Sequence, residues 1–379
     1  MKTNNNRLES RTRKKEMTMK TILKILCLSM ISLASYGNTF GQTSKHQDCA
    51  DELFFVSKEG KWGLVDKTGK IVVEPQFDDV YAFSEGLAPV FLNDKWGFID
   101  KTGQLVIDPR YTYVGRFFEG FAKVEVDGRF GFIDKTGKWV IEPQFDHAGI
   151  FSEGFAVVEV AGRYGFIDKT GNLVVEPQFD YAGNFSEGFA IVEVEERYGF
   201  IDKSGKLVIE LEQQFNRVFD FSEGMACVRI EIESEEDKLG FIDKSGKIVI
   251  EPKFDYVGNF SDGLALVSMN EKMGFIDKSG KIVIEPKFDN VGNFSDGLAP
   301  VSMNEKLGFI DKSGKIVIEP KFDYVKDFCN GLAPVFMNDK WGLIDKTGKI
   351  VVEPQFDGGL CSKNGECYDE WGGGFRVEP

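Results

Sequence analysis

The sequence predicts an all-β protein built as a tandem array, and two observations support this prediction. First, nine segments share one skeleton: a large apolar residue, a glycine, a short apolar run and Asp-Lys-Thr/Ser-Gly. They follow one another at steps of 34 residues, with one step of 41, and a fixed period of this size indicates a repeat architecture. Second, the apolar runs are short, rich in Val, Ile and Phe, and bounded by turn residues, as strands are. The large apolar residues are Trp62, Trp96, Phe130, Tyr164, Tyr198, Leu239, Met273, Leu307 and Trp341.

One unit is clearest between residues 86 and 119. Its three apolar runs, residues 86–92, 95–100 and 104–109, are expected to form a three-stranded antiparallel sheet. No window of the chain keeps a sustained apolar period of 3.6 residues, so we expect almost no helix. The fold class predicted from the sequence is therefore a tandem array of nine antiparallel β units of ~34 residues.

Turn chemistry explains the recurring letters of the unit. Gly103 closes a three-residue hairpin loop, where glycine adopts a positive φ without steric cost. Asp100, before that loop, is expected to accept backbone hydrogen bonds, because calcium binding would need more oxygen ligands at closer spacing. Gly97, after Trp96, is expected to leave room for a neighbouring backbone or a bulge. Pro109 lacks an N–H donor and is expected to stop the third strand.

The arrangement of the units is expected to be an open, curved or superhelical stack. The first unit begins at Leu53 and the ninth closes near Asp357, so no split terminal unit is evident to close a ring. Nine units of three strands also depart from propellers, which usually have four to eight blades of four strands. The alternative is a closed, propeller-like ring.

The chain divides into a leader, a repeat array and a tail. Residues 1–41 hold basic residues, a short apolar run and small residues, the pattern of a secretory signal peptide, and translation starts at Met17 or Met19 in one hypothesis. Residues 42–52 are expected to be a linker and 53–357 the repeats. We therefore expect an exported protein, periplasmic, cell-surface or secreted, without a membrane span in the mature chain.

Charge and cysteine content exclude several classes of site and partner. The net charge is −15, and residues 1–41 carry eight basic and two acidic side chains, which leaves −21 for the remainder. So acidic a chain argues against nucleic acid as a partner. With two histidines, His46 and His147, and no Cys-x-x-Cys, a zinc site is not expected, and no other metal or cofactor site is predicted. Outside the leader five cysteines remain: Cys49, Cys227, Cys329, Cys361 and Cys367.

The recurring Lys-Trp-Gly-Phe-Ile-Asp-Lys-Thr-Gly-Lys-x-Val-Ile-Glu-Pro-x-Phe-Asp resembles the WG (KWG) β-repeat of bacterial proteins. The resemblance covers residues 53–357 and recurs nine times. It implies a tandem β-repeat protein, often exported, without a general enzymatic activity. It implies no catalytic residue, because the motif of the family has none.

Alternate positions of the first run in each unit behave differently along the array. Ala88 and Val90 keep similar apolar identities in the other units, whereas the intervening column changes freely. Successive residues of a strand point to opposite faces, so one face is predicted to be core and the other solvent-exposed. We call the variable column the binding stripe, and its candidate recognition residues are Phe91, Glu125, Glu159, Glu193, Arg229 and Phe336. The alternative is that this column is merely solvated surface.

Two classes of function remain open. The first is an exported, non-enzymatic binding or scaffold protein that contacts a protein, peptide or glycan along the binding stripe. The second is a glycan-directed hydrolase with paired carboxylates. Acidic residues recur in every unit, as turn chemistry requires, whereas an active site needs a unique constellation, and the sequence contains none that we recognise. No catalytic residue is predicted.

The tail, residues 358–379, leaves the repeat pattern. Cys361 and Cys367 are expected to face each other in a hairpin and to form a disulfide, with Gly365 at the positive-φ position of the loop. The alternative is a pair of free thiols in a frayed terminus.

Overall fold

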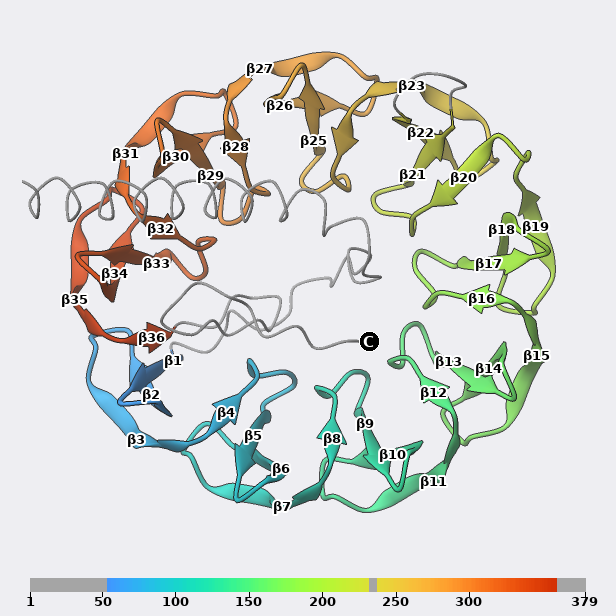
Figure 1. Cartoon of the computed structure of the whole chain (residues 1–379), viewed down its shortest axis with the longest axis horizontal. Coiled ribbons are helices and arrows are strands. Elements are labelled where there is room, and N and C mark those ends of the chain that lie inside the picture. The colour runs from blue at the N-terminus through green and yellow to red at the C-terminus, as the bar shows by residue number, and fades with distance from the viewer. Residues whose placement is uncertain (1–52, 232–236, 360–379) are drawn as a thin grey trace, which may run out of the picture. The chain divides into compact units, whose positions relative to one another are not determined.

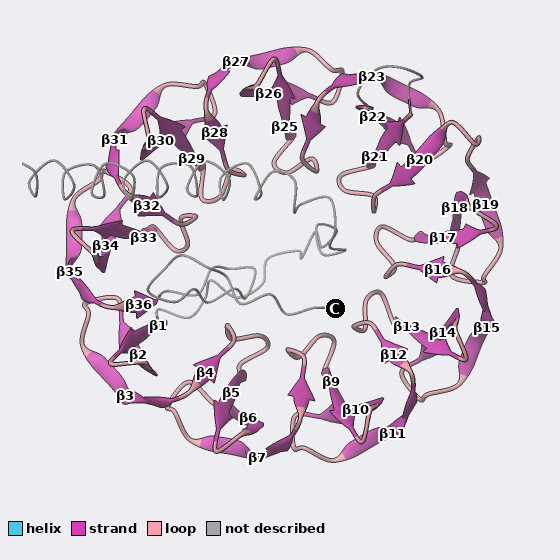
Figure 2. Ribbon diagram, in the orientation of Figure 1, coloured by secondary structure: helices cyan, strands magenta, loops and turns pink. Residues whose placement is uncertain are grey.

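A computed structural model describes residues 53–231 and 237–359, which belong to one compact unit of the chain, residues 41–375. The described residues form strands, turns and loops, with no helix among them (Figure 2). Across these two ranges, therefore, nothing helical is long and apolar enough to cross a membrane. The predicted all-β class is confirmed.

The described strands form nine four-stranded antiparallel sheets, which we call blades 1 to 9. Each blade is a meander of a short first strand, two longer middle strands and a rim strand, and the rim strands lie along the outside of a ring (Figure 1). The sequence predicted three of the four strands. The fourth is a two-residue pairing made by the connector in most blades, too short to leave a periodic signal.

The strand bounds repeat with the period of the sequence. The first strands are β36 (Gly358–Gly359), β4 (Asp79–Val80), β8 (Tyr113–Val114), β12 (His147–Ala148), β16 (Tyr181–Ala182), β20 (Phe215–Val218), β24 (Tyr256–Val257), β28 (Asn290–Val291) and β32 (Tyr324–Val325). The second strands are β1 (Leu53–Lys58), β5 (Ala88–Leu92), β9 (Phe121–Val126), β13 (Phe155–Val160), β17 (Ala190–Val194), β21 (Met225–Ile230), β25 (Leu264–Met269), β29 (Leu298–Met303) and β33 (Leu332–Met337). The third strands are β2 (Lys61–Asp66), β6 (Lys95–Ile99), β10 (Arg129–Asp134), β14 (Arg163–Asp168), β18 (Arg197–Ile201), β22 (Lys238–Asp243), β26 (Lys272–Asp277), β30 (Lys306–Asp311) and β34 (Lys340–Asp345). The rim strands are β3 (Ile71–Phe77), β7 (Leu105–Tyr111), β11 (Trp139–Phe145), β15 (Leu173–Phe179), β19 (Leu207–Glu210), β23 (Ile248–Phe254), β27 (Ile282–Phe288), β31 (Ile316–Phe322) and β35 (Ile350–Phe356).

The hairpin between the third and rim strands is built as the sequence predicted. In blade 2, Asp100 Oδ1 accepts hydrogen bonds from the Thr102 hydroxyl (2.6 Å) and from the backbone N–H groups of Thr102 (2.8 Å) and Gln104 (3.1 Å). These bonds hold the pKa of the Asp100 carboxyl below its usual range, the Thr102 hydroxyl being the largest cause. Gly103 has a φ of 82°, the left-handed conformation that glycine adopts at little cost.

The glycine after the large apolar residue accommodates a bulge in the rim strand. A Cβ on Gly97 would lie 2.5 Å from the carbonyl oxygen of Ile107 and 2.7 Å from the nitrogen of Pro109. The register shifts here, because Trp96 pairs with Tyr111 whereas Phe98 pairs with Ile107. Pro109 therefore lies inside β7, at the bulge of an edge strand, and the prediction that it stops the strand was wrong.

The hydrophobic cores lie between blades rather than within them. Between blades 4 and 5, one face of blade 4 contributes Val157 and Phe166, and the opposite face of blade 5 contributes Ala190 and Val192. The same division holds for the cluster between blades 3 and 4, where blade 4 supplies its other face through residues such as Ala156. Both faces of a blade are thus buried against its two neighbours, and no blade has a core of its own.

The ring is closed by the last described strand. β36 pairs with β1 in blade 1, with Val56 opposite Gly359. Trp341 and Val352 of blade 9 pack with Val56 and Val65 of blade 1, as neighbouring blades do elsewhere. The expected open stack is therefore wrong, and the alternative, a closed propeller-like ring, is confirmed. The closure could not be predicted from the sequence, because a strand of two glycines leaves no periodic pattern of apolar residues.

The turn glycine of each blade also contacts the preceding blade, which makes it testable. A Cβ on Gly103 would overlap the side chain of Val73 in blade 1, whereas a Cβ on Gly86, with a φ of 89°, meets nothing within 4 Å. Gly103→Ala should lower the free energy of unfolding by about 2–4 kcal/mol, combining backbone strain and overpacking. Gly86→Ala, the matched control, should cost only about 1–2 kcal/mol. Urea denaturation measures both, and equal losses would show that the Gly103 turn does not contact blade 1.

Candidate functional site

A recurring acidic residue in the loop after the first strand joins neighbouring blades. In the loop after the first strand of blade 3, Glu119 accepts a hydrogen bond from the N–H of Gly154 (2.9 Å) and pairs with Lys169 (3.1 Å), both in blade 4. Each pair is half-exposed, so its individual contribution to stability is small. The inter-blade pairs of this kind are Glu85–Lys135, Glu119–Lys169, Glu153–Lys203, Glu187–Lys244, Glu223–Lys278, Asp262–Lys312 and Asp296–Lys346.

A second recurring carboxylate fixes each crossover from one blade to the next. Asp146 pairs with Arg129 of blade 3 and accepts a hydrogen bond from the N–H of Ala161 in blade 4 (2.8 Å). At the closure of the ring, Asp357 pairs with Lys340 and accepts a bond from the N–H of Glu59 in the same way. Because these carboxylates serve turns and blade junctions, residues for recognition are better sought among those that differ between blades.

Side chains that differ between blades lie together in a row across each sheet. Three residues, one from each of the first three strands, are directly opposite one another beside the hairpin that joins the second and third strands. We call these sets the hairpin rows. From blade 1 to blade 9 they are Gly358-Ser57-Trp62, Asp79-Phe91-Trp96, Tyr113-Glu125-Phe130, His147-Glu159-Tyr164, Tyr181-Glu193-Tyr198, Arg217-Arg229-Leu239, Tyr256-Ser268-Met273, Asn290-Ser302-Leu307 and Tyr324-Phe336-Trp341.

The six candidate residues of the binding stripe occupy the middle of their hairpin rows. All six are half-buried, so the expectation that this face points to solvent was wrong. This face of each blade packs on the next blade, and the stripe lies at the edge of that interface, between the buried core and the solvent. Phe91, for example, packs against Trp96 with ring centroids 5.2 Å apart. The structure brings Glu125, Glu159 and Glu193 to equivalent positions on consecutive blades. The six candidate residues are Phe91, Glu125, Glu159, Glu193, Arg229 and Phe336.

Aromatic side chains of the rows form a continuous band over blades 3 to 5. The ring centroids of Tyr113 and Phe130 are 6.0 Å apart, and those of Phe130 and His147, across the blade junction, are 5.8 Å apart. His147 contacts Tyr164 at 6.4 Å, and Tyr164 contacts Tyr181 of blade 5 at 5.9 Å. We call these five residues the aromatic band. The third residue of one row thus contacts the first residue of the next.

Carboxylates accompany the aromatic band. Burial raises the pKa of Tyr164, and the charge and hydrogen bond of Glu159 raise it further. Glu193 acts on Tyr198 in the same way, again after burial. In blade 3, burial and then the charge of Glu125 raise the pKa of Tyr113 to about 12. Each of these glutamates therefore lies close to a tyrosine hydroxyl, which donates to it in blades 4 and 5.

Lys123 is a cation inserted beside the band. Its column is apolar in the other blades, but here its ammonium group lies 5.5 Å from the ring centre of Tyr113 and 5.6 Å from that of Phe130. Its Nζ donates a hydrogen bond to the carbonyl oxygen of Ala148 in blade 4 (2.9 Å). Burial lowers the pKa of Lys123 to about 8. Cation–π contact and this bond favour the charged form and partly offset the burial.

Blade 6 replaces the aromatic row with charge. Arg217 and Arg229 are directly opposite in the ladder, where like charges repel. Arg229 Nε donates to Asn216 Oδ1 (3.0 Å) and lies 3.3 Å from Asp237, which supplies a compensating charge. In the adjoining loop, burial raises the pKa of Asp220 to about 7.

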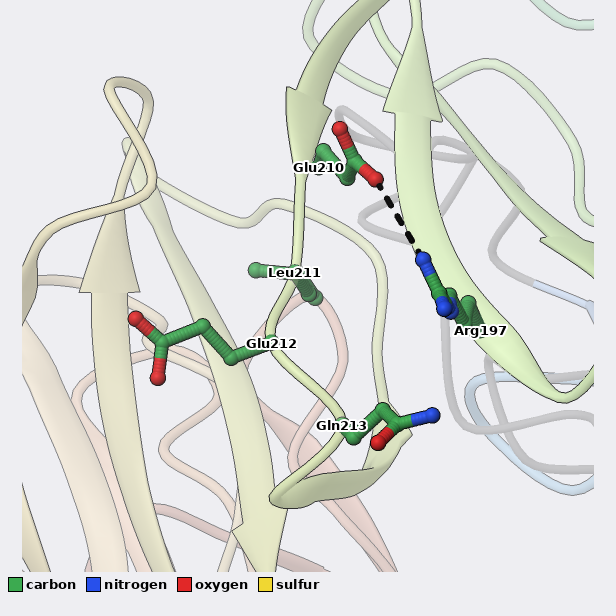
Figure 3. A pocket seen from close by; sticks show the side chains of 5 residues that line it. All are labelled: Arg197, Glu210, Leu211, Glu212 and Gln213. Carbon is green, nitrogen blue, oxygen red and sulfur yellow. Dashed lines mark ion pairs between the residues drawn. The ribbon is translucent and has the colours of Figure 1, made fainter.

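The junction of blades 5 and 6 is irregular, and Leu211 stands there in place of the proline of the other blades. β19 ends at Glu210, and a pocket of about 220 Å³ opens there. It is lined by Arg197, Glu210, Leu211, Glu212 and Gln213 (Figure 3). The Leu211 side chain turns away into the core, leaving a polar, open rim with an Arg197–Glu210 pair at 3.9 Å. A pocket smaller than the usual ligand sites of about 300–1,000 Å³ offers a weak site for a small molecule.

The sequence located the stripe but missed its neighbours in the rows. Tyr113, His147 and Tyr181 stand in the connectors, which the sequence assigned no strand, so their place opposite the glutamates could not be seen. Lys123 carried a signal, because it is a cation in an otherwise apolar column. Within residues 53–231 and 237–359, no three His, Cys, Asp or Glu side chains gather in a way that could hold a metal ion. The predicted disulfide of Cys361 and Cys367 lies outside the described residues.

Nine segments of the chain match the family model described as WG containing repeat. The matched residues are 62–96, 96–130, 130–164, 164–198, 198–231, 240–272, 273–306, 308–341 and 341–365. They cover most of the chain, which therefore belongs to the WG-repeat family. Comparison with curated proteins finds no matching relative.

Solved structures with a similar course of the chain are distant. Dihydro-heme d1 dehydrogenase NirN, in complex with DHE, is 13% identical over 73% of this chain and 75% of its own, with a TM-score of 0.44. Kluyveromyces lactis Hsv2p is 11% identical over 70% and 96%, with a TM-score of 0.39. One of two prolyl endopeptidases is 12% identical over 64% and 49%, with a TM-score of 0.41. These likenesses carry no argument about activity.

The buried ammonium group of Lys123 gives stability a specific pH dependence. The pKa of about 8 in the folded chain lies below the ordinary value of 10.5, so between these values the unfolded chain binds more protons and stability rises with pH. Relative to Lys123→Met, the wild type should gain about 2 kcal/mol of unfolding free energy between pH 8 and 10.5. Lys138→Met, which removes an exposed ammonium group, is the control. Urea denaturation measures the free energy of unfolding at each pH. If this free energy changed with pH by the same amount in wild type and in Lys123→Met, the placement of Lys123 would be contradicted.

Proposed function

We propose that this WG-repeat ring is an exported, non-catalytic binding or scaffold module whose recognition surface is formed by the hairpin rows of blades 3 to 6. One observation carries the proposal. The recurring aspartates of the turns and crossovers and the acidic residues of the loops are engaged in turns and blade junctions, whereas many of the side chains that differ between blades gather in the rows. Closure of the ring does not require these differences, because the same blade sequence can be used more than once. Blades 6 to 8, for example, are nearly identical in their third and rim strands.

The chemistry of the rows fits a peptide or glycan with apolar faces and hydrogen-bond donors. Half-buried rings of Tyr113, Tyr164 and Tyr181 offer faces for stacking, and Glu159 and Glu193 beside them offer acceptors. Repeat proteins commonly bind their partners along an extended surface formed by successive repeats. The acidic net charge supports a neutral or cationic ligand and argues against nucleic acid.

Catalysis is not part of the proposal. Glu159 and Glu193 lie close to tyrosine hydroxyls, and the loop and crossover carboxylates, such as Glu119 and Asp146, are engaged in blade junctions, so these groups are poorly placed to act as a general acid and base pair. A glycan-directed hydrolase remains the second candidate. Incubation of the mature chain with each bound glycan, followed by mass spectrometry, would reveal cleaved products if that candidate were correct.

Export rests on the pattern of residues 1–41. Expression of the full chain in a bacterium followed by N-terminal sequencing of the exported fraction should give a mature chain that begins after the small residues at 34–41. Recovery of the uncleaved chain from the cytoplasm alone would contradict export.

The recognition surface can be tested with a matched pair of triple variants. Peptide and glycan arrays probed with the mature chain should identify ligands, and Glu125→Gln, Glu159→Gln and Glu193→Gln together should weaken their binding at least tenfold, because three acceptors become amides. The control is Glu74→Gln, Glu142→Gln and Glu176→Gln, which makes the same charge change on exposed positions of rim strands.

Both variants should fold, because each substitution keeps the shape of the side chain. Equal binding by the row variant and wild type, measured by isothermal titration calorimetry, would place recognition elsewhere on the ring. A loss in the control alone would assign it to the rim.

A further inference from the structure

The loop after each first strand of blades 2 to 9 is a tight two-residue turn. In blade 9, the N–H of Cys329 donates to the carbonyl oxygen of Leu332 (2.8 Å), and the N–H of Leu332 donates to that of Cys329 (3.1 Å). Asn330 and Gly331, between them, have φ values of 50° and 79°, so both are left-handed. Blades 2 to 8 contain the same turn, with glycine second. The first residue therefore adopts a conformation that is costly for a residue with a Cβ.

Blades 2 to 8 have an acidic residue at this first position. The seven residues are Glu85, Glu119, Glu153, Glu187, Glu223, Asp262 and Asp296. Each of them pairs with a lysine of the next blade. In blade 8, Asp296 Oδ2 also accepts a hydrogen bond from the N–H of Gly331 in blade 9 (2.8 Å). The contact with the next blade explains why a carboxylate is kept at a strained position.

Blade 9 differs, because its turn has the exposed amide of Asn330 in place of the carboxylate. The next blade is blade 1, across the seam where the ring closes. The lysine of this column in blade 1 is Lys67, and its turn packs on blade 9 as at the other junctions: a Cβ on Gly69 would lie 2.8 Å from Cγ1 of Val352. The seam therefore has the lysine turn of the other junctions and an amide where they have a carboxylate.

Asn330 is followed by a glycine whose nitrogen can attack it. A backbone nitrogen can react with the side chain of a preceding asparagine to close a five-membered ring, and glycine, which has no Cβ, hinders this attack least. The N–H of Gly331 is already hydrogen-bonded to Asp296, and a general base must lie within this reach of the proton that it abstracts. We propose that Asn330 deamidates autocatalytically, with Asp296 as the base, and that the product supplies a carboxylate to the seam.

The reaction needs only water. The nitrogen of Gly331 forms a bond to Cγ of Asn330 while Asp296 takes its proton. The bond between Cγ and Nδ2 then breaks, and the amide nitrogen leaves as ammonia with the proton that Asp296 returns. Water opens the resulting succinimide to aspartate or isoaspartate, so one water is consumed, one ammonia is released and Asp296 is unchanged. The aspartate product has the carboxylate of blades 2 to 8 and faces Lys67.

Peptide mapping of the full chain, freshly purified and after incubation at neutral pH, tests the reaction. After reduction, trypsin releases residues 327–340, and tandem mass spectrometry should show the amide at 330 converting to an acid. Asp296→Gln keeps an oxygen acceptor for the N–H of Gly331 but removes the base, so conversion should slow by roughly a factor of ten or more. Asp296→Glu, the matched control, introduces the residue of blades 2 to 6 and should react like wild type.

Two results would overturn the proposal. Asn-Gly is also the pair that such turns prefer, so a residue 330 that stays an amide would show that it serves the turn alone. Equal rates of conversion in Asp296→Gln and Asp296→Glu would show that Asp296 is not the base.

Thermal melts test the role of the product. Asn330→Asp, which presents the carboxylate from the start, should raise the melting temperature by roughly 1–3 °C, as an exposed ion pair does. The same substitution in a Lys67→Met background should bring no gain, because its partner is removed. An unchanged melting temperature of Asn330→Asp, or an equal gain with and without Lys67, would contradict the role of the carboxylate at the seam.

Discussion

The packing of each blade on its two neighbours is the interaction on which the rest of this structure depends. A four-stranded sheet of this size buries little by itself, and here it is apolar on both faces: Ala156 and Val158 face blade 3, and Val157 and Phe166 face blade 5. An open array would leave two such faces in water at its ends. Closure removes both ends at once, which explains why a two-residue strand such as β36 is sufficient to complete the ring.

The polar residues of the repeat serve the same packing. The turn aspartate orders its own hairpin, the loop glutamate binds the next blade, and the crossover aspartate fixes the connection between blades. Each contact is modest, but it recurs around the ring. Many of the differences between one part of the ring and another therefore lie at the margin of each core, in the hairpin rows, where a side chain can change without opening a cavity.

The rows of blades 3 to 6 are the most differentiated part of that margin. Ring contacts pass from Tyr113 to Tyr181 across two blade junctions, and the row of blade 6 then changes to Arg217 and Arg229. Such a change from aromatic to cationic chemistry over a short stretch gives the ring a direction, which an unvaried repeat would lack. Recognition on this surface would follow from that asymmetry.

The sequence by itself determined the all-β class, the nine units, the hairpin turns at residues such as Gly103 and the reason for Gly97, because these depend on local chemistry and a fixed period. It also singled out the variable column of the second strands, whose role in binding stays a prediction. The tertiary structure decided closure, since an open and a closed array share one period and differ only in small rotations set by packing between blades. It likewise decided that the stripe borders a core and that Tyr113 stands opposite Glu125, because a pairing of two residues leaves no periodic trace in a sequence.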